Sequence, residues 1–148
     1  GGVCLNWGCI PTKALLKSAQ VFEYIKKAEA YGLKIKDFDK DFDAVVKRSR
    51  DVASGMSKGV NFLMKKNKIE VINGYGKIKP NKIVSVENDG TEMDFEADNI
   101  IIATGGRSRV IDSIPQDGKK IIGYREAMTL QKQPKKMIIV GSGAIGIE

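Results

Sequence analysis

The chain has 148 residues, of which 42% are hydrophobic and 29% are charged, as is typical of a globular protein. Its 25 Lys and Arg against 18 Asp and Glu give a net charge of +7, but only 7% of the residues are aromatic, so the charge indicates a solvated basic surface rather than a nucleic-acid-binding one. Two cysteines and no histidine are too few ligands for a structural zinc site, and no apolar run approaches the roughly 20 residues of a membrane-spanning helix.

In chain order, the first predicted elements are two long helices. Pro11 suits the first turn of a helix, and apolar residues then recur at three- and four-residue steps until Gly32, a residue type that commonly ends helices. The four aspartates between positions 37 and 43 place negative charge at the start of a second helix. Its apolar stripe runs from Phe42 to Met64, so we expect this helix to exceed about 20 residues, which is long for a globular domain.

Strands are predicted after the helices. Alternating segments at 69–79, 82–88 and 91–98, with a turn at Asn88-Asp89-Gly90, indicate a small antiparallel sheet. "NIIIATGG" (99–106) and the start of "KKMIIVGSGAIGIE" (135–148) are typical of buried strands that run into glycine turns. "KIIGY" (120–124) predicts a short strand and "REAMTL" (125–130) a helical turn.

The two cysteines of the chain, Cys4 and Cys9, lie in one glycine-bounded turn ahead of the first helix. They could form a structural disulfide or stay as two reduced buried thiols, but a staple across so short a loop would contribute only about 2 kcal/mol. A redox pair fits the pattern better, because Cys9 precedes a helix N-terminus and Lys13 adds a cation, and both favour a reactive thiolate.

The last eleven residues carry a glycine motif. Gly141, Gly143 and Gly146 have the G-x-G-x-x-G spacing that follows a strand in dinucleotide-binding folds, where a tight turn leads the pyrophosphate to a helix N-terminus. The rest of such a unit would lie beyond Glu148, and the chain does not begin with methionine. We therefore expect residues 1–148 to be an internal piece of a longer protein and to be inactive alone.

The segment "GGVCLNWGCIPTKALL" (1–16) resembles the active-site segment of the pyridine nucleotide–disulfide oxidoreductases, and most closely that of the members that oxidise dihydrolipoamide, whose pattern is C-L-N-x-G-C-I-P-[ST]-K. "NGYGKI" (73–78), "IIIATGG" (100–106) and "MIIVGSGAIGIE" (137–148) are similar to further segments of the same family, in the same order. The resemblance therefore covers essentially the whole chain. It departs at Trp7, where many members carry valine, and we interpret this as a packing variant; Asn6 is expected to hold the turn.

The resemblance implies a role for each residue of the redox site. Cys4 would be the thiol that exchanges with the lipoyl disulfide, and Cys9 would lie against the flavin in a charge-transfer contact. Lys13 would stand beside the reactive edge of the flavin, and Glu148 would pair with Lys13. Electrons would pass from dihydrolipoamide to the disulfide formed by Cys4 and Cys9, and then through FAD to NAD.

The resemblance also implies cofactor contacts, which we favour over the alternative that the glycines are ordinary turn residues. Those expected at FAD are Lys13, Gly76, Thr104, Gly105 and Gly106. Those expected at NAD are Gly141, Ser142, Gly143, Ala144, Ile145, Gly146, Ile147 and Glu148. Gly146 favours NAD over NADP, because glutathione reductases that use NADP often have alanine there.

The implied fold class is α/β, made of parts of two Rossmann-like three-layer domains with a small antiparallel insert. Residues 1–106 would belong to the FAD-binding domain and 107–148 would begin the NAD-binding domain. The partners implied are a second copy of the protein, which supplies a catalytic histidine that this chain lacks, and the lipoyl domain of a 2-oxoacid dehydrogenase or glycine-cleavage complex, in the cytoplasm or mitochondrial matrix.

Two alternatives remain open. One is a related disulfide reductase of the glutathione or mercuric reductase type that uses NADPH. The other is a non-catalytic binding module in which the two cysteines are an incidental staple.

Overall fold

The structure is a computed structural model that describes residues 2–148. Its described residues divide into two compact units, one made of residues up to Lys58 together with Gly105–Glu148, and the other of Gly59–Thr104. Each unit is described by itself below. Among residues 2–148 no helix is long and apolar enough to cross a membrane.

The first unit opens with a short helix and a long one. Helix α1 (Val3–Trp7) is followed by Gly8 and by α2 (Cys9–Lys26), which continues into the 3-10 helix η1 (Ala28–Tyr31). Gly32 ends this run in the left-handed conformation with φ of 73°, as the sequence predicts. Pro11 falls in the first turn of α2, where its missing N–H costs no intrahelical bond, and it is fully buried.

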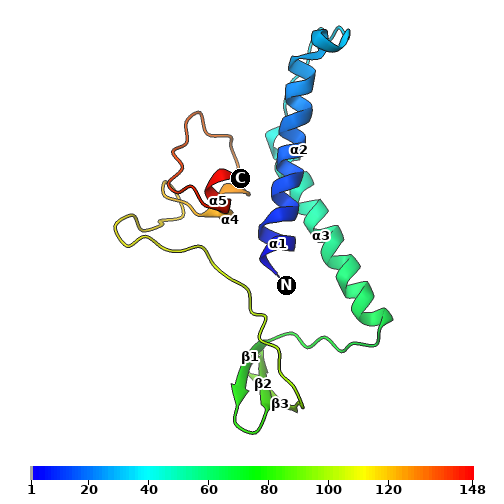
Figure 1. The fold of residues 1–148 in the computed structure, drawn as a ribbon, viewed down its shortest axis with the longest axis vertical. Helices are drawn as coiled ribbons and strands as arrows, with labels where there is room; N and C mark the ends of the chain where they lie inside the picture. Colours follow the sequence, from blue (N-terminus) through cyan, green and yellow to red (C-terminus); the bar gives the residue numbers. More distant parts are fainter. Residues whose placement is uncertain (1) are drawn as a thin grey trace. The chain divides into compact units, whose positions relative to one another are not determined.

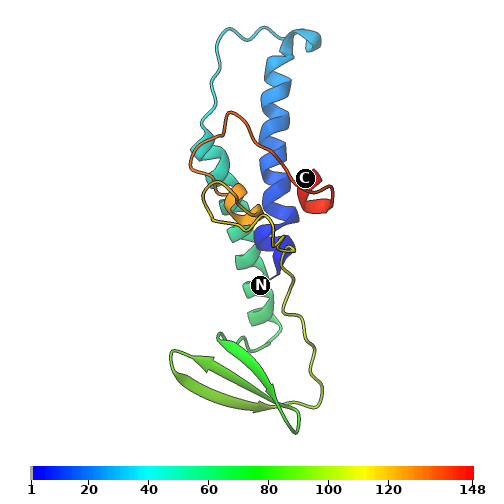
Figure 2. The same cartoon turned by 90° about the vertical axis from the view of Figure 1, so that its left-hand side faces the viewer.

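Helix α3 (Phe42–Lys66) confirms the predicted long second helix with its 25 residues. Asp41 caps it, because the Asp41 carboxylate accepts a 2.9 Å hydrogen bond from the Ala44 N–H and the Asp41 carbonyl accepts the N–H of Val45. Figures 1 and 2 both show α2 and the N-terminal part of α3 side by side. Between them Arg48 donates a 2.8 Å hydrogen bond to the Ala14 carbonyl oxygen, and the Ser49 side chain is fully buried.

The second unit contains the three-stranded antiparallel sheet that the sequence predicts at 69–98. Its strands are β1 (Tyr75–Lys79), β2 (Ile83–Asn88) and β3 (Thr91–Glu96), in the order β1-β2-β3. Asn88 pairs with Thr91, so Asp89 and Gly90 form a two-residue turn with φ of 50° and 78°. Both values lie in the left-handed region that such a hairpin turn requires.

Three of the predicted strands are absent from the structure. Residues 99–106, 120–124 and 137–140 are not strands, and Ile101 and Ile138 are each 90% exposed rather than buried. A buried parallel strand needs hydrogen-bonded neighbours on both sides, and within residues 2–148 the only sheet is β1-β2-β3. These apolar segments therefore have no strand to pair with. The predicted helical turn is present as α4 (Tyr124–Ala127), and α5 (Ala144–Ile147) follows the glycine motif.

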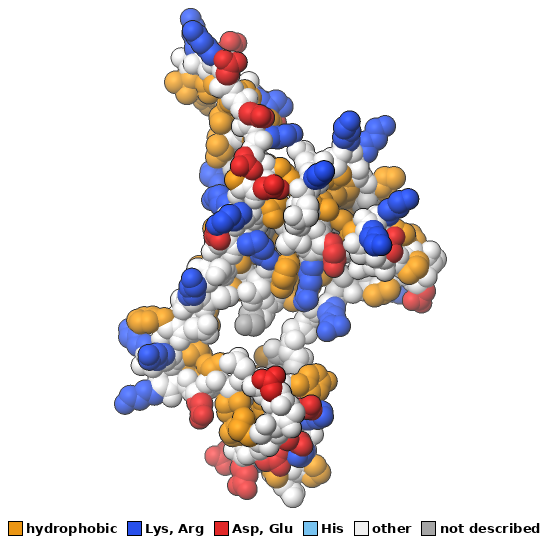
Figure 3. All heavy atoms as spheres, turned by 180° about the vertical axis from the view of Figure 1, so that it is seen from behind, with side chains coloured by type: hydrophobic (Ala, Val, Ile, Leu, Met, Phe, Trp, Pro, Cys, Tyr) orange, Lys and Arg blue, Asp and Glu red, His pale blue; other side chains and the backbone are white. Residues whose placement is uncertain are grey.

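The charged side chains are interspersed. On the face drawn in Figure 3, Lys and Arg alternate with Asp and Glu, and apolar side chains show between them. Several apolar residues of α3 are among those exposed: Val52, Met56, Val60, Phe62 and Leu63. The buried side chains of the first unit include the small Ala14, Ala28, Ser49 and Ala53 together with the larger Pro11 and Met128.

We predict opposite effects for two Gly→Ala substitutions that meet no neighbouring atom within 4 Å. Gly90→Ala forces a side chain into the left-handed region and should lower the stability of the sheet by about 1 kcal/mol. Gly55→Ala lies inside α3 and should raise stability by about 0.5–1 kcal/mol, because alanine loses less backbone entropy in a helix. Urea midpoints of the full-length protein would check both; a lower midpoint for Gly55→Ala would contradict the second.

Candidate redox site around the cysteine pair

The two cysteines lie on either side of the junction between α1 and α2. Cys4 is in α1 and Cys9 is the first residue of α2. Gly8 between the helices has φ of −144° and ψ of −121°, and an ideal Cβ there would be 3.0 Å from the Val3 carbonyl oxygen and 3.1 Å from the Cys4 Cα. Any side chain at Gly8 would therefore push α1 away from the start of α2.

Both cysteines are free thiols and both are exposed. The pKa of the Cys4 thiol is raised above its ordinary value, chiefly by its hydrogen bond with the Cys9 side chain, and further by reduced hydration and by the negative charges of Cys9 and Glu148. A backbone hydrogen bond from Cys9 acts in the opposite direction. Cys4 therefore keeps its proton to a higher pH than an isolated cysteine. The enhanced reactivity expected of Cys9 from its place at a helix start stays a prediction.

Lys13 and Glu148 form the ion pair that the resemblance implied. The Lys13 ammonium contacts a carboxylate oxygen of Glu148 across 135 positions of sequence. Their side chains are 63% and 39% exposed, so the pair contributes at most about 1 kcal/mol to stability. Its consequence is positional: it holds the end of the chain beside the first turns of α2, and Figures 1 and 2 both show α5 next to α2.

The glycine motif forms a tight turn that leads into α5, which contains Gly146. Gly141 has φ of 117°, and an ideal Cβ at Gly146 would collide with the Gly141 carbonyl oxygen. The backbone thus folds so closely on itself that only glycine fits at 146. The predicted turn and helix start are confirmed, whereas the strand before them is not formed.

The first unit brings together most of the predicted redox residues. Cys4 interacts with Cys9, Lys13 pairs with Glu148, and the charge of Glu148 acts on Cys4. An ideal Cβ at Gly105 would lie 4.0 Å from a methyl group of Val3. Two other predicted FAD contacts, Gly76 in β1 and Thr104, belong to the second unit.

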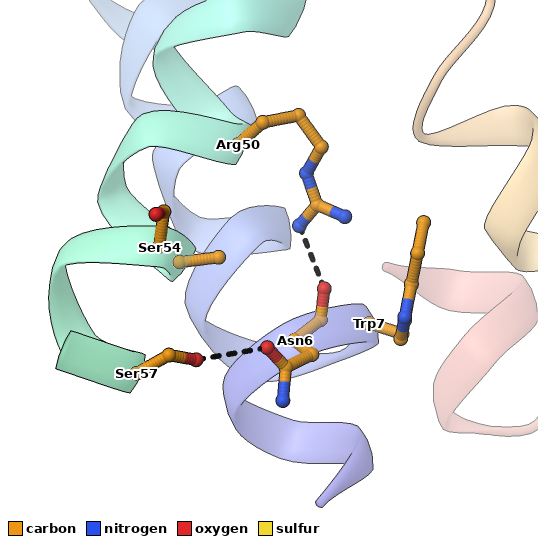
Figure 4. Close-up of a pocket in the computed structure, with 6 residues that line it drawn as sticks. Asn6, Trp7, Arg50, Ser54 and Ser57 are labelled. Atoms are coloured by element: carbon orange, nitrogen blue, oxygen red, sulfur yellow. Dashed lines mark hydrogen bonds between the residues drawn. The ribbon is translucent and has the colours of Figure 1, made fainter. Parts of the chain in front are cut away.

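Sequence analysis missed a group of residues on α3 that contact the segment between the cysteines. Figure 4 shows Arg50 and Ser57 reaching from α3 to Asn6, with Trp7 beside them. They border a cavity of about 280 Å³ lined by Asn6, Trp7, Arg50, Ala53, Ser54 and Ser57. The only sequence signal was the run of small residues at 53, 54 and 57, at helical spacing, which favours close packing against a neighbouring element.

Within residues 2–148, no group of three or more Cys, His, Asp or Glu side chains is placed to bind a metal ion.

Comparison with known proteins identifies the class. The family described as pyridine nucleotide-disulphide oxidoreductase matches residues 1–148, and the chain belongs to this family. The similar relatives are dihydrolipoyl dehydrogenases: those of Zymomonas mobilis and Chlorobaculum parvum are each 50% identical over 100% of this chain, which covers 32% of each. The chain thus spans about a third of the length of these relatives.

A solved structure has a similar fold. The crystal structure of LpdA from Mycobacterium tuberculosis matches with a TM-score of 0.79 at 20% identity, over 88% of this chain and 29% of that one. At that identity the likeness concerns the fold alone.

We predict that Cys9→Ala lowers the pKa of Cys4. The substitution removes the side-chain hydrogen bond and the negative charge that together raise this pKa, while the backbone N–H of residue 9 remains. Because the thiolate is the nucleophile, Cys4 in the variant should react with iodoacetamide at lower pH than Cys4 in the reduced wild-type protein. The folded protein would be alkylated at each pH from 6 to 10, and the modification of Cys4 would then be quantified in its peptide by mass spectrometry. An unshifted or higher midpoint of the rate-against-pH curve in the variant would contradict the prediction.

Proposed function

We propose that the full-length protein is a dihydrolipoyl dehydrogenase that oxidises protein-bound dihydrolipoamide with NAD. The observation that carries the proposal is the coupled pair of exposed thiols, Cys4 and Cys9, within a C-L-N-x-G-C segment. Relatives that carry the name dihydrolipoyl dehydrogenase at 50% identity over the whole chain support the substrate. Two exposed sulfurs in contact at a helix start can exchange with a disulfide or dithiol of a partner.

The proposed reaction is thiol–disulfide exchange followed by reoxidation. In the oxidised protein, one thiolate of dihydrolipoamide attacks Cys4 sulfur, forming a mixed disulfide and releasing Cys9 as a thiolate. The second substrate thiol then attacks its neighbour within the mixed disulfide, which releases Cys4 and closes the lipoamide ring. Two electrons and two protons thereby pass to the cysteine pair. FAD, when bound beside Cys9 and Lys13, would supply the two-electron chemistry that links the reduced pair to NAD⁺.

The residues present fit these cofactors. Cys9 and the Lys13 side chain are both exposed, so a planar ring bound there would meet a thiol and the cation of the Lys13–Glu148 pair. We infer that FAD is held by Lys13, Gly76 and residues 104–106, and NAD by Gly141–Glu148, where the closely folded glycine turn leaves backbone atoms open to a phosphate. Residues 1–106 and 107–148 would then be parts of two Rossmann-like three-layer domains.

The same proposal assigns partners and place. A protein-bound lipoyl group belongs to a 2-oxoacid dehydrogenase or glycine-cleavage complex. By resemblance to the family, the histidine acid/base would come from a second copy of the full-length protein, outside residues 1–148, which contain no histidine. The proposed site of action is the cytoplasm or, in a eukaryote, the mitochondrial matrix.

We predict that Cys4→Ser in the full-length protein abolishes the reduction of NAD by dihydrolipoamide, by at least about a thousandfold, because serine cannot form the mixed disulfide. Flavin content should stay that of the wild type, since the proposal places Cys9, and not Cys4, against the flavin ring. The assay is NADH absorbance, run beside NADPH-driven reduction of glutathione disulfide. Wild-type activity only in the second assay would replace the proposed substrate, and activity that survives Cys4→Ser in either would overturn the redox role of the pair.

We predict that Glu148→Gln shifts the flavin absorbance of the full-length protein and slows flavin reduction by dihydrolipoamide several-fold. The substitution removes the charge that pairs with Lys13 and leaves this cation free beside the proposed ring. Glu23→Gln is the matched control, because Glu23 forms an exposed ion pair with Lys26 on α2, away from the cysteines. Equal spectra and rates for the two variants, measured by stopped-flow, would contradict the placement of the Lys13–Glu148 pair at the flavin.

A further inference from the structure

Arg50 of α3 contacts the segment between the cysteines in two ways. Its guanidinium donates a 2.7 Å hydrogen bond to the carbonyl oxygen of Asn6, and its Cζ lies 4.5 Å from the centre of the Trp7 ring. Figure 4 shows the side chain extending from α3 toward α1 with the indole beside it. Arg50 lies 44 positions from Asn6 in the sequence, yet it contacts the segment between the two cysteines.

The bond to Asn6 meets a need of α1. A helix of five residues cannot pair its last carbonyl groups within itself, and such groups must find other donors. A guanidinium at this end satisfies one of them and also complements the negative end of the peptide dipoles. A charge-assisted hydrogen bond of this length is about twice as strong as a neutral one.

Asn6 is held from α3 a second time. The Ser57 hydroxyl donates a 3.0 Å hydrogen bond to Asn6 Oδ1, while Asn6 Nδ2 donates to the Gly2 carbonyl oxygen within α1's own first turn. Asn6, which lies between the two cysteines in the sequence, is therefore fixed through its backbone and its side chain. The segment cannot rotate about its axis without breaking one of these bonds.

Trp7 completes the contact. Besides Arg50, the Arg125 guanidinium of α4 lies over its ring, with its Cζ 5.5 Å from the centre. Two cations near one indole gain cation–π attraction that exists only if the ring stays in this place. The Arg50 Nε is buried and has no hydrogen-bond partner in the described part of the chain, so the arginine loses hydration in order to make these contacts.

We infer that Arg50 is a positioning residue for the cysteine pair: by binding the Asn6 carbonyl and the Trp7 ring, it fixes the turn from α3 so that the sulfur of Cys4 stays against that of Cys9. The inference rests on the proposed function, because only a redox pair needs its sulfurs held at bonding range. Holding two thiols together raises the effective concentration of one at the other and so favours the disulfide. Arg50 touches neither sulfur and acts through the segment.

The chain offers a matched control in Arg48. This residue is on the same helix and donates hydrogen bonds to the Ala14 carbonyl oxygen at 2.8 Å and to the Ser18 hydroxyl at 3.4 Å. Arg48→Gln and Arg50→Gln therefore each remove one arginine–carbonyl bond between α3 and the preceding helices. Only Arg50→Gln releases the segment between the cysteines.

We predict that Arg50→Gln lowers the equilibrium constant for forming the Cys4–Cys9 disulfide by about three- to tenfold, a tenfold change being about 30 mV toward a more oxidising potential. The constant is measured on the full-length flavin-loaded protein in buffers of reduced and oxidised dithiothreitol, by trapping thiols and quantifying the Cys4–Cys9 peptide. Arg48→Gln should match the wild type within twofold. Melting temperatures of both variants check that each is folded.

Two further variants keep the test decisive if Arg50→Gln does not fold. Arg50→Lys keeps the charge but not the planar group that lies over Trp7, and Ser57→Ala removes the other bond to Asn6; each should lower the constant in the same direction by a smaller factor. Constants for folded Arg50 variants equal to that of Arg48→Gln would overturn the inference and leave the proposed function standing. A wild-type protein that forms no Cys4–Cys9 disulfide at any dithiothreitol ratio would overturn both.

Discussion

At Gly8 the first turn of α2 comes against the backbone of α1 with no space for a side chain between them, since an ideal Cβ would be 3.0 Å from the Val3 carbonyl oxygen. This close approach sets Cys4 beside Cys9, and their hydrogen bond couples the two thiols. The other interactions of the site serve this junction: each holds one of the two helices to a more distant part of the first unit. Without the junction the pair would be two unrelated surface cysteines.

Three contacts between distant segments surround the junction. Arg50 binds the turn from α3, Arg125 of α4 lies over Trp7, and Glu148 pairs with Lys13 on α2. The Lys13–Glu148 pair is exposed and adds little stability, whereas the Arg50 contact is partly buried. Their shared effect is to fix the geometry of the segment that carries the two cysteines, while both thiols stay exposed.

The local elements followed from the sequence because local physics determines them. Apolar spacing, the aspartates before α3, the left-handed Gly32 and the Asp89-Gly90 turn each act within a few residues. The apolar runs at 99–106 and 137–140 were predicted as strands and are exposed coil instead. Their state depends on neighbouring strands, and the chain spans only about a third of its relatives' length, so periodicity within the run could not decide it.

The sequence by itself determined the family, the redox pair of Cys4 and Cys9 as a prediction, and the pairing of Lys13 with Glu148, because family motifs keep residue types at fixed spacing. Only the tertiary structure decided that Arg50 reaches the turn, that Trp7 lies near two guanidinium groups, and that the pKa of Cys4 is raised. These depend on which side chains of separate helices come within hydrogen-bonding or ring-contact distance. Such proximity arises from packing, and one-dimensional spacing does not encode it.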